Sequence, residues 1–316
     1  MAEIRDIDLK LTGIEEEIRE AEKAGASLEE LDDLHAEYDL TAEAAVDLTA
    51  HDKIYLARNV RRPKIDDYIQ ALFQDFFVQR GDLLNKEDAS ILGGIATFHG
   101  MPVTVIGHRK GRNLEENLKY NFGMPEPEGY RKALRLMKQA EKFGRPIITF
   151  IDTPGAYPGL DAEEHGQSQA ISMNLAEMSA LKVPVISIVT GEGSSGGALA
   201  IGVANSVYML ENAVYSVLSP EGFATILWKD SSKAPEASEL MKLTANDLYD
   251  FGVIDGIISE PKGGMHHNPT VVYNEIDEVL TKELKKFRKM SGAEVAKQRY
   301  TKFRNIDQRE LKKNEE

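Results

Sequence analysis

The residues with the most evident chemical potential lie in segment 191–197, GEGSSGG, which follows the apolar run PVISIVT. Glycines at the start of a helix leave backbone N–H groups uncovered by side chains, and the helix dipole adds positive potential at that end. Such amides form an oxyanion hole, which stabilises negative charge on a reacting oxygen, for example that of an enolate. Because four glycines in seven residues exceed what one tight turn requires, we favour an oxyanion hole without a side-chain nucleophile.

The same segment also fits the pattern G-x-S-x-G, through Gly193, Ser195 and Gly197. In serine hydrolases this pattern exposes a nucleophilic serine on a sharp turn between a strand and a helix. The serine needs a histidine base and a carboxylate, and the downstream histidines are His266 and His267, in the loop KGGMHHNP. These two histidines are at least as well explained as exposed loop residues. A serine hydrolase therefore stays as the alternative function.

A third pattern in the segment is G-x-G-x-x-G, formed by Gly191, Gly193 and Gly196, with Glu211 about 20 residues further along the chain. This spacing is that of a dinucleotide-binding turn. The apolar helix that follows, from Gly197 to about residue 204, is barely two turns long, whereas a crossover between parallel strands needs about ten residues or more. The sequence therefore disfavours a dinucleotide site.

Regular elements must position these residues, and the region from about residue 60 has the required pattern. The runs ILGGIATF and PVTVIGH predict adjacent strands joined at His99-Gly100, and a helix is predicted from about Pro127 to Phe143. A strand followed by a glycine- or proline-rich turn and a helix recurs at about residues 147, 185 and, loosely, 207. We expect an α/β fold of stacked strand-strand-helix repeats whose strand-end loops gather on one side.

The first 52 residues differ from the rest, because they hold 17 acidic and only 4 basic side chains. Ser27 and Glu30 have the spacing of a capping box at the start of a second helix. Apolar residues before this box recur at helical three- and four-residue steps: Ile4, Ile7, Leu11, Ile14 and Ile18. The pattern predicts a helical hairpin whose apolar stripe docks on the body of its own chain.

The other end of the chain has the opposite charge, with 12 basic and 6 acidic side chains in residues 281–316. Residues 271–290 are predicted to form a helix. We divide the chain into an acidic helical arm over 1–52, a core domain over 53–290 and a basic C-terminal tail over 291–316. Two solvated appendages are the simplest interpretation, and the alternative is that the arm and the tail lie against each other or against a partner.

Composition excludes several classes of protein. The 316 residues include no cysteine, which rules out disulfides, thiolate nucleophiles and cysteine-built metal sites. The net charge of −14 disfavours nucleic acid as a partner. No apolar run approaches the roughly 20 residues that a bilayer span needs, and the start MAEIRDIDLK lacks the apolar core of a signal peptide. We expect a cytoplasmic protein without a membrane segment.

Longer strings then carry a resemblance to a known family. They are ILGGIATFHGMPVTVIGHRKGR, NFGMPEPEGYRKALRLM, ITFIDTPGAYPG, GEGSSGGALAIG and SVLSPEGFATILWKD. In this order they resemble the α subunit of the bacterial acetyl-CoA carboxylase carboxyltransferase, most strongly from about residue 60 to residue 270. The resemblance implies a crotonase-like fold, with the N-terminal helical arm and the C-terminal helices as additions to it.

The resemblance also implies a reaction and partners. Members of the family transfer a carboxyl group from carboxybiotin, presented on the biotin carboxyl carrier protein, to acetyl-CoA, which gives malonyl-CoA for fatty acid biosynthesis. The α subunit works with a β subunit, usually as an α2β2 heterotetramer, and a separate biotin carboxylase uses the ATP. Zinc is expected on the four-cysteine ribbon of the β subunit, and no metal is expected on this chain.

Site residues follow from the resemblance by position. Gly196 and Gly197 match the glycines that form the oxyanion hole facing biotin, and we expect them to be catalytic; Gly193 and Ser195 are expected to contact substrate. The biotin anion itself can act as the base, so no catalytic histidine is required.

Two further groups are candidates for substrate binding. Gly155 and Ala156, in the turn TPGAYPG, line the same cleft or form an ordinary β-turn. Arg109 and Arg112, in the cluster HRKGR at 108–112, attract the carboxylate or the CoA phosphates or belong to a solvated loop.

Overall fold

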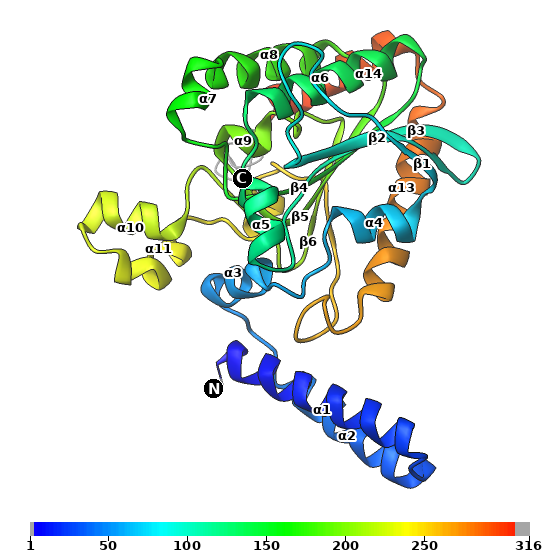
Figure 1. Ribbon diagram of the computed structural model, residues 1–316, viewed down its shortest axis with the longest axis vertical. Coiled ribbons are helices and arrows are strands. Elements are labelled where there is room, and N and C mark those ends of the chain that lie inside the picture. The colour runs from blue at the N-terminus through cyan, green and yellow to red at the C-terminus, as the bar shows by residue number, and fades with distance from the viewer. Residues whose placement is uncertain (1–2, 307–316) are drawn as a thin grey trace, which may run out of the picture.

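The computed structural model describes residues 3–306 and is built around one mixed sheet (Figure 1). Along the sheet the strand order is β1-β2-β3-β4-β5-β6-β8, and β7 pairs with the far end of β5. The strands are β1 (Gln74–Val78), β2 (Ile91–Phe98), β3 (Met101–His108), β4 (Ile147–Thr153), β5 (Val185–Ser194), β6 (Ser206–Leu210), β7 (Val214–Ser216) and β8 (Gly256–Ile258).

The pairing of the strands places the glycine-rich turns at one edge. β2 and β3 form the predicted antiparallel hairpin, which turns at His99-Gly100. From β3 onward all neighbours are parallel, β3 with β4, β4 with β5, β5 with β6 and β6 with β8. The carboxyl ends of parallel strands meet at one edge of a sheet, which is where α/β proteins build their sites. The loops after β4 and β5 therefore lie side by side.

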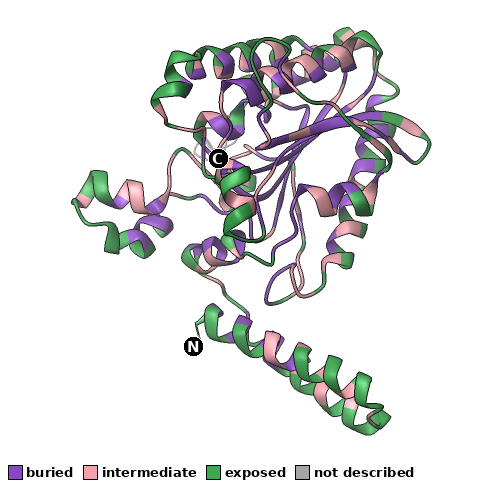
Figure 2. Cartoon of the chain, in the orientation of Figure 1, coloured by how far each residue is buried: buried purple, intermediate pink, exposed green. Residues whose placement is uncertain are grey.

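Helices cover the sheet and close the core. α6 (Pro127–Lys142), α8 (Gln167–Ala180) and α14 (Gly292–Arg304) lie together on one side, and α4 (Ile65–Leu72) packs with α13 (Pro269–Phe287) on another (Figure 1). Every residue of β4 and β5 is buried, as Figure 2 shows for the middle of the sheet. The near-continuous apolar runs of these two strands suit a parallel sheet covered on both faces.

The acidic N-terminal residues form the predicted helical hairpin, α1 (Ile4–Ala24) and α2 (Leu28–Glu43), at the lower end of Figure 1. The predicted capping box is present, because Ser27 accepts from the Glu30 amide and Glu30 accepts from the Ser27 amide. The stripe residues Ile4, Ile7 and Leu11 pack with Leu56 of α3 (Ala50–Arg58). The arm therefore docks on its own chain, as predicted.

The pairing of arm and tail was the wrong alternative for the residues described. α14, which holds most of the basic tail through residue 306, packs against α8 at the opposite end of the molecule from α1 and α2 (Figure 1). Its buried Arg299 donates to the carbonyls of Met178, Leu181 and Val183. Residues 307–316 lie outside the described residues.

The remaining helices are short and lie at the edges of the fold. α10 (Pro220–Trp228) and α11 (Ala234–Leu240) project together from the body (Figure 1), joined through η2 (Ser231–Lys233). The others are α5 (Leu114–Lys119), η1 (Asn121–Gly123), α7 (Leu160–Glu164), α9 (Ser195–Leu199) and α12 (Ala245–Asp250). Across residues 3–306, no helix combines the length and apolar character that crossing a membrane would demand.

Candidate active site

Two neighbouring turns at the carboxyl ends of β4 and β5 form the candidate site. Thr153, the last residue of β4, pairs with Gly193 of β5. The Thr153 hydroxyl accepts a hydrogen bond from the Gly155 amide at 3.0 Å and donates to the Gly155 carbonyl oxygen at 2.8 Å, which fixes the turn that follows β4. Gly155 has φ of +140°, a conformation that favours glycine. The local sequence therefore sets the shape of this turn.

The turn after β4 presses directly against the start of α9. A Cβ atom placed on Gly197 would lie 2.6 Å from the Ala156 nitrogen and 2.7 Å from the Gly155 carbonyl carbon. These are backbone atoms, so no side-chain movement could make room for the methyl group of alanine. Gly155 and Ala156 are thus brought to the predicted catalytic glycine, and the turn they form is part of the same site.

The amides of Gly196 and Gly197 lie in the first turn of α9, where no helical partner exists for them. Within residues 3–306, no backbone or side-chain oxygen accepts a hydrogen bond from either amide. Gly196 has more room than Gly197, because an added Cβ would meet only the Ile171 side chain, at 3.4 Å. The pair is therefore available to bind a developing oxyanion.

The helix behind these amides is shorter than predicted. α9 ends at Leu199, whereas the sequence indicated helix to about residue 204. Five residues give only a small dipole, so the free amides themselves carry the electrostatic effect. The loop and helix of residues 195–205 nevertheless connect β5 to its parallel neighbour β6, so a short crossover was not a sound argument against a dinucleotide site. Glu211, the acidic residue of the dinucleotide pattern, has a structural partner. Its carboxylate accepts a hydrogen bond from the Glu260 amide, at 3.0 Å.

Ser195 is the first residue of α9 and precedes the two glycines. Its side chain is exposed and its φ of +53° is strained for a residue with a Cβ atom. Among the described residues, no histidine forms a hydrogen bond with the Ser195 hydroxyl, and His266 and His267 are bonded to Asp8 instead. The base that a serine hydrolase needs is therefore engaged elsewhere. Gly193 is buried in β5, where its Cα faces the ring of Tyr215.

A network of charges lies at the same strand ends and was not predicted. Lys110 Nζ lies 2.7 Å from Asp152 Oδ1 of β4 and 3.0 Å from Glu192 Oε2 of β5. Arg58 of α3 contacts Glu192 and, through a second nitrogen, Glu221 of α10, both at 2.6 Å. The sequence signal was an acid beside each glycine turn and a lysine after β3, all at strand ends that a parallel sheet brings together.

The network holds its carboxylates ionised. Burial alone would raise the pKa of Asp152 and of Glu192, but the positive charge of Lys110 lowers both. The hydrogen bond from Arg58 lowers the pKa of Glu221 to about 2. His108 differs from these carboxylates in its charge state. It has 2% of its surface exposed and lies beside the backbone of Gly197 and Phe150. Burial lowers its pKa to about 4, so the ring is neutral at pH 7.

The cluster at residues 108–112 is only in part the solvated loop that was one of its two interpretations, because Arg112 is exposed but the other residues of the cluster are not. His108 is buried, and only 14% of the Lys110 side chain is exposed. The two arginines already have acidic partners on α4: Arg109 binds Asp66 through two nitrogens, at 2.6 and 3.0 Å, and Arg112 binds Asp67 at 2.6 Å. Their charges are thus neutralised within the chain.

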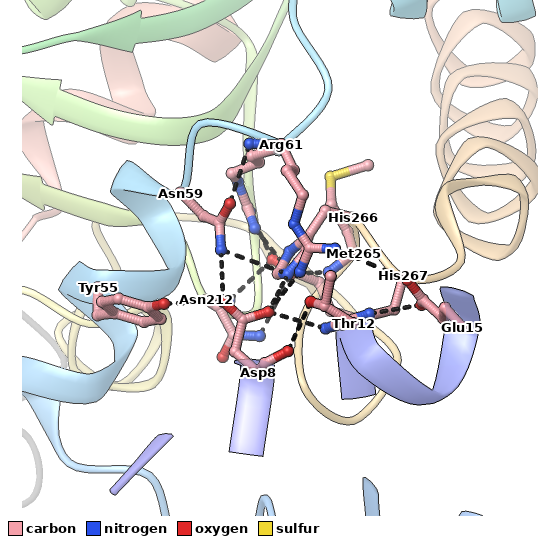
Figure 3. Close-up of polar contacts among 12 residues, drawn as sticks. Asp8, Thr12, Glu15, Tyr55, Asn59, Arg61, Asn212, Met265, His266 and His267 are labelled. Carbon is pink, nitrogen blue, oxygen red and sulfur yellow. Dashed lines mark hydrogen bonds and ion pairs between the residues drawn. The ribbon is translucent and has the colours of Figure 1, made fainter. Parts of the chain in front are cut away.

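Exposure in a loop, one of the two interpretations of His266 and His267, was wrong. The side chains of both are fully buried at the junction of the arm with the body (Figure 3). Asp8 Oδ1 accepts from His266 at 2.8 Å, His267 at 3.0 Å and Arg61 at 2.6 Å. We call this group, together with Glu15, Tyr55 and Asn59, the arm latch; Glu15 binds His267 Nδ1, and Tyr55 and Asn59 donate to Asp8 Oδ2.

The arm latch has donor atoms at metal-ligand spacing, because those of Asp8, His266 and His267 lie within 4.8 Å of one another. The Arg61 guanidinium, however, contacts the same Asp8 oxygen and supplies the positive charge there. Burial alone would raise the Asp8 pKa, but hydrogen bonds from His266 and His267 hold it well below its usual range. The latch is therefore an ion-pair cluster that fastens α1 to the body.

Comparisons with known proteins identify the family of the chain. A family described as "Acetyl co-enzyme A carboxylase carboxyltransferase-like" matches residues 2–307. Proteins named acetyl-coenzyme A carboxylase carboxyl transferase subunit alpha are similar to the chain. That of Listeria monocytogenes serotype 4b (strain CLIP80459) is 59% identical over 259 residues, 82% of this chain and 81% of that protein. That of Listeria welshimeri is 54% identical over 304 residues, 96% and 90% of the two chains.

Solved structures show the same fold at low sequence identity. A Pseudomonas malonate decarboxylase hetero-tetramer in complex with malonate superposes with a TM-score of 0.55 at 16% identity, covering 72% of this chain and 92% of that one. Transcarboxylase 12S gives 0.55 at 18% identity, covering 71% and 44%. The predicted crotonase-like α/β fold is confirmed. The chain therefore belongs to the family of acetyl-CoA carboxylase carboxyltransferase α subunits.

Proposed function

We propose that this chain is the α half of an acetyl-CoA carboxylase carboxyltransferase, which transfers the carboxyl group of carboxybiotin to acetyl-CoA and yields malonyl-CoA. Its family and the names of its relatives support the reaction class. The observation that carries the assignment of the site is the contact between Gly197 and the Gly155-Ala156 turn, which leaves the amides of Gly196 and Gly197 uncovered.

The residues fit a biotin-linked carboxyl donor. When bound, that group would supply the carboxyl to be transferred and an oxygen on which negative charge develops. The amides of Gly196 and Gly197 would donate hydrogen bonds to such an oxygen, since nothing within residues 3–306 competes for them. Removal of one such donor costs about 10²–10³ in rate in comparable sites.

The neighbouring residues position and shield these amides. Gly155 and Ala156 form one wall, and the exposed Ser195 stands at the entrance, where it contacts substrate. Gly193 has an indirect role, because it is the buried residue of β5 that leads into the turn. We assign no substrate contact to Arg109 and Arg112, because Asp66 and Asp67 already neutralise them.

The second half of the site belongs to a partner. We propose a zinc-ribbon β subunit in an α2β2 assembly, a biotin carboxyl carrier protein that delivers carboxybiotin, and a biotin carboxylase in the wider complex. The absence of cysteine from the sequence means that a four-cysteine zinc ribbon has to be on another chain. The projecting pair α10 and α11 offers exposed apolar side chains to such a partner, including Ile226 and Leu227.

The experiment that tests this function measures malonyl-CoA decarboxylation in the presence of biocytin, the reverse reaction. The chain is assayed alone, the zinc-loaded partner from the same organism alone, and the two mixed. Activity that appears only in the mixture supports a shared site. An assembled, zinc-loaded complex that turns over neither malonyl-CoA nor acetyl-CoA would overturn the proposal.

A further inference from the structure

A cavity of about 590 Å³ lies at the amino ends of β3, β4 and β5. It is therefore at the opposite edge of the sheet from the turns that hold Gly155 and Gly197. The end of α13 and the first turn of α14 close it from the side. The volume falls within the range of about 300–1,000 Å³ typical of small-molecule sites.

Much of the cavity wall is apolar. Its lining includes the side chains of Met101, Phe143, Leu284, Phe287 and Val295, together with three prolines at the strand starts. Phe143 is the most accessible of the five side chains other than proline, with 62% of its surface exposed. A ligand with a short hydrocarbon part would cover apolar surface that now faces water.

The polar lining is basic. Arg145, Lys182 and Arg288 line the cavity, and none of the residues that line it is an aspartate or a glutamate. Lys182 and Arg288 form no ion pair with any residue in 3–306. Its fourth ionisable residue, His99, already bonds to Asp277 at 2.7 Å. The cavity therefore presents positive charge with no lining carboxylate to balance it.

Arg145 is the most informative of these residues, because only 9% of it is exposed. Its guanidinium donates to two neutral oxygens, Thr104 Oγ1 at 3.2 Å and Gln139 Oε1 at 3.1 Å, and its Cζ lies 5.2 Å from the centre of the Phe143 ring. Burial lowers the Arg145 pKa, and no carboxylate counteracts this. Arginine residues with so little exposed surface usually have an acidic partner, and Arg145 forms no ion pair within residues 3–306.

Glu141, which contacts the backbone of Lys182, is not an ion-pair partner of the lining cations. Glu141 accepts from the Lys182 amide at 2.9 Å and from the Lys138 side chain at 3.1 Å, and it does not contact Arg145. No carboxylate side chain therefore occupies the position beside Arg145, and a ligand can bind there.

We propose that this cavity binds a small organic anion, with a carboxylate or phosphate head group on Arg145 and a short hydrocarbon part against Phe143 and Phe287. A planar guanidinium suits either head group, and Lys182 and Arg288 add charge at the rim. The site lies away from the amides of Gly196 and Gly197, so the proposal does not depend on the proposed reaction.

Calorimetric titration of the full chain tests the proposal without any turnover. Hexanoate and hexyl phosphate are the probes, and hexan-1-ol is the neutral comparison. We expect saturable one-to-one binding of at least one anion, at least about tenfold tighter than hexan-1-ol because charge-assisted hydrogen bonds are lost with the alcohol. The tighter of the two anions identifies the head group.

Variants place the binding site. Arg145→Gln should weaken anion binding by about tenfold or more, and Arg145→Lys should restore part of it. Lys285→Gln is the matched control, because Lys285 is exposed on α13 and does not line the cavity. Binding by Lys285→Gln should equal that of the unmodified chain.

A second variant guards against misfolding of Arg145→Gln. Lys182 and Arg288 are both exposed, so the double variant Lys182→Gln/Arg288→Gln should fold normally and bind the anion about tenfold more weakly. The proposal would be overturned if neither anion gave a saturable binding curve in the calorimetric titration. An unchanged dissociation constant in folded Arg145→Gln or in the double variant would also overturn it.

Discussion

Two polar regions of the molecule invite opposite functional interpretations. The arm latch gathers two buried histidines, two carboxylates and an arginine, and several of these groups have shifted pKa values. At the turns of Gly155 and Gly197 the candidate donors are backbone amides rather than titratable side chains. Shifted pKa values often mark active sites, yet we propose that the chemistry takes place at the glycines.

The reason lies in what each region leaves unsatisfied. In the latch nearly every polar atom has a partner, so its groups stabilise one another and hold the arm. At the glycines two backbone amides have no partner among residues 3–306. A site that stabilises an oxyanion needs free donors, not titratable groups. The proposed site therefore rests on unpartnered backbone donors and not on shifted pKa values.

The largest expected effect comes from Gly197→Ala. The new Cβ atom would have to displace the backbone of Gly155 and Ala156, and this moves the amides out of position. We expect carboxyl transfer in the assembled complex to fall by about 10²–10³. Steady-state rates measured on a complex shown intact by gel filtration check the prediction. Near-normal turnover would mean that the contact between the two turns has no catalytic role.

The next effect is on stability and concerns Lys110. Lys110→Met leaves Asp152 and Glu192 buried beside each other without the shared cation. We expect a loss of about 3–5 kcal/mol in unfolding free energy, or roughly 5–15 °C in Tm.

Lys10→Gln is the control, because the ion pair of Lys10 with Glu37 is exposed and should contribute little. Thermal unfolding of both variants gives the answer. Equal Tm values for the two would show that the charges at the strand ends are not a structural network.

The smallest effect is a pH dependence in the latch. Burial alone would lower the pKa of His267, but the hydrogen bonds to Asp8 and Glu15 raise it. Its contribution to stability is therefore complete below the unfolded pKa near 6.5 and is lost as pH rises through the raised folded value. The pKa of His266 is lowered, chiefly by burial, so this residue acts in the opposite direction.

The variant His267→Gln isolates the His267 contribution. The Tm difference between the unmodified chain and this variant should be greatest near pH 6, at about 2–4 °C for about 1 kcal/mol, and should shrink toward pH 9. Differential scanning calorimetry across this range measures it. A difference that does not change with pH would show that protonated His267 does not stabilise the latch.

Local patterns were sufficient to predict several of the elements. The alternation around His99-Gly100 gave the hairpin of β2 and β3, and the run after Pro127 gave α6. The capping box at Ser27 and Glu30 located the start of α2. In each case the signal and the structure lie within a few residues, so the sequence alone contains the information.

Long-range contacts were beyond such patterns. His266 and His267 meet Asp8 across more than 250 positions of sequence, so nothing in the loop KGGMHHNP indicated that they are buried. Lys110 and Glu192 lie 82 positions apart, and their pairing depends on the strand order. The approach of Gly155 to Gly197 was one of two interpretations of its turn, and only the parallel pairing of β4 with β5 decided it.

The most direct test of the central claim compares Gly196→Val with Asp8→Asn. At Gly196 an added Cβ meets only Ile171, at 3.4 Å, so the valine should fit the fold while it covers the free amides. Asp8→Asn disrupts the latch at its centre. Carboxyl transfer by both variants is measured in the assembled complex.

We expect Gly196→Val to lose about 10²–10³ in rate and Asp8→Asn to stay within about twofold of the unmodified complex, because distant sites act independently. The reverse order, with the latch variant inactive and the glycine variant active, would contradict the account.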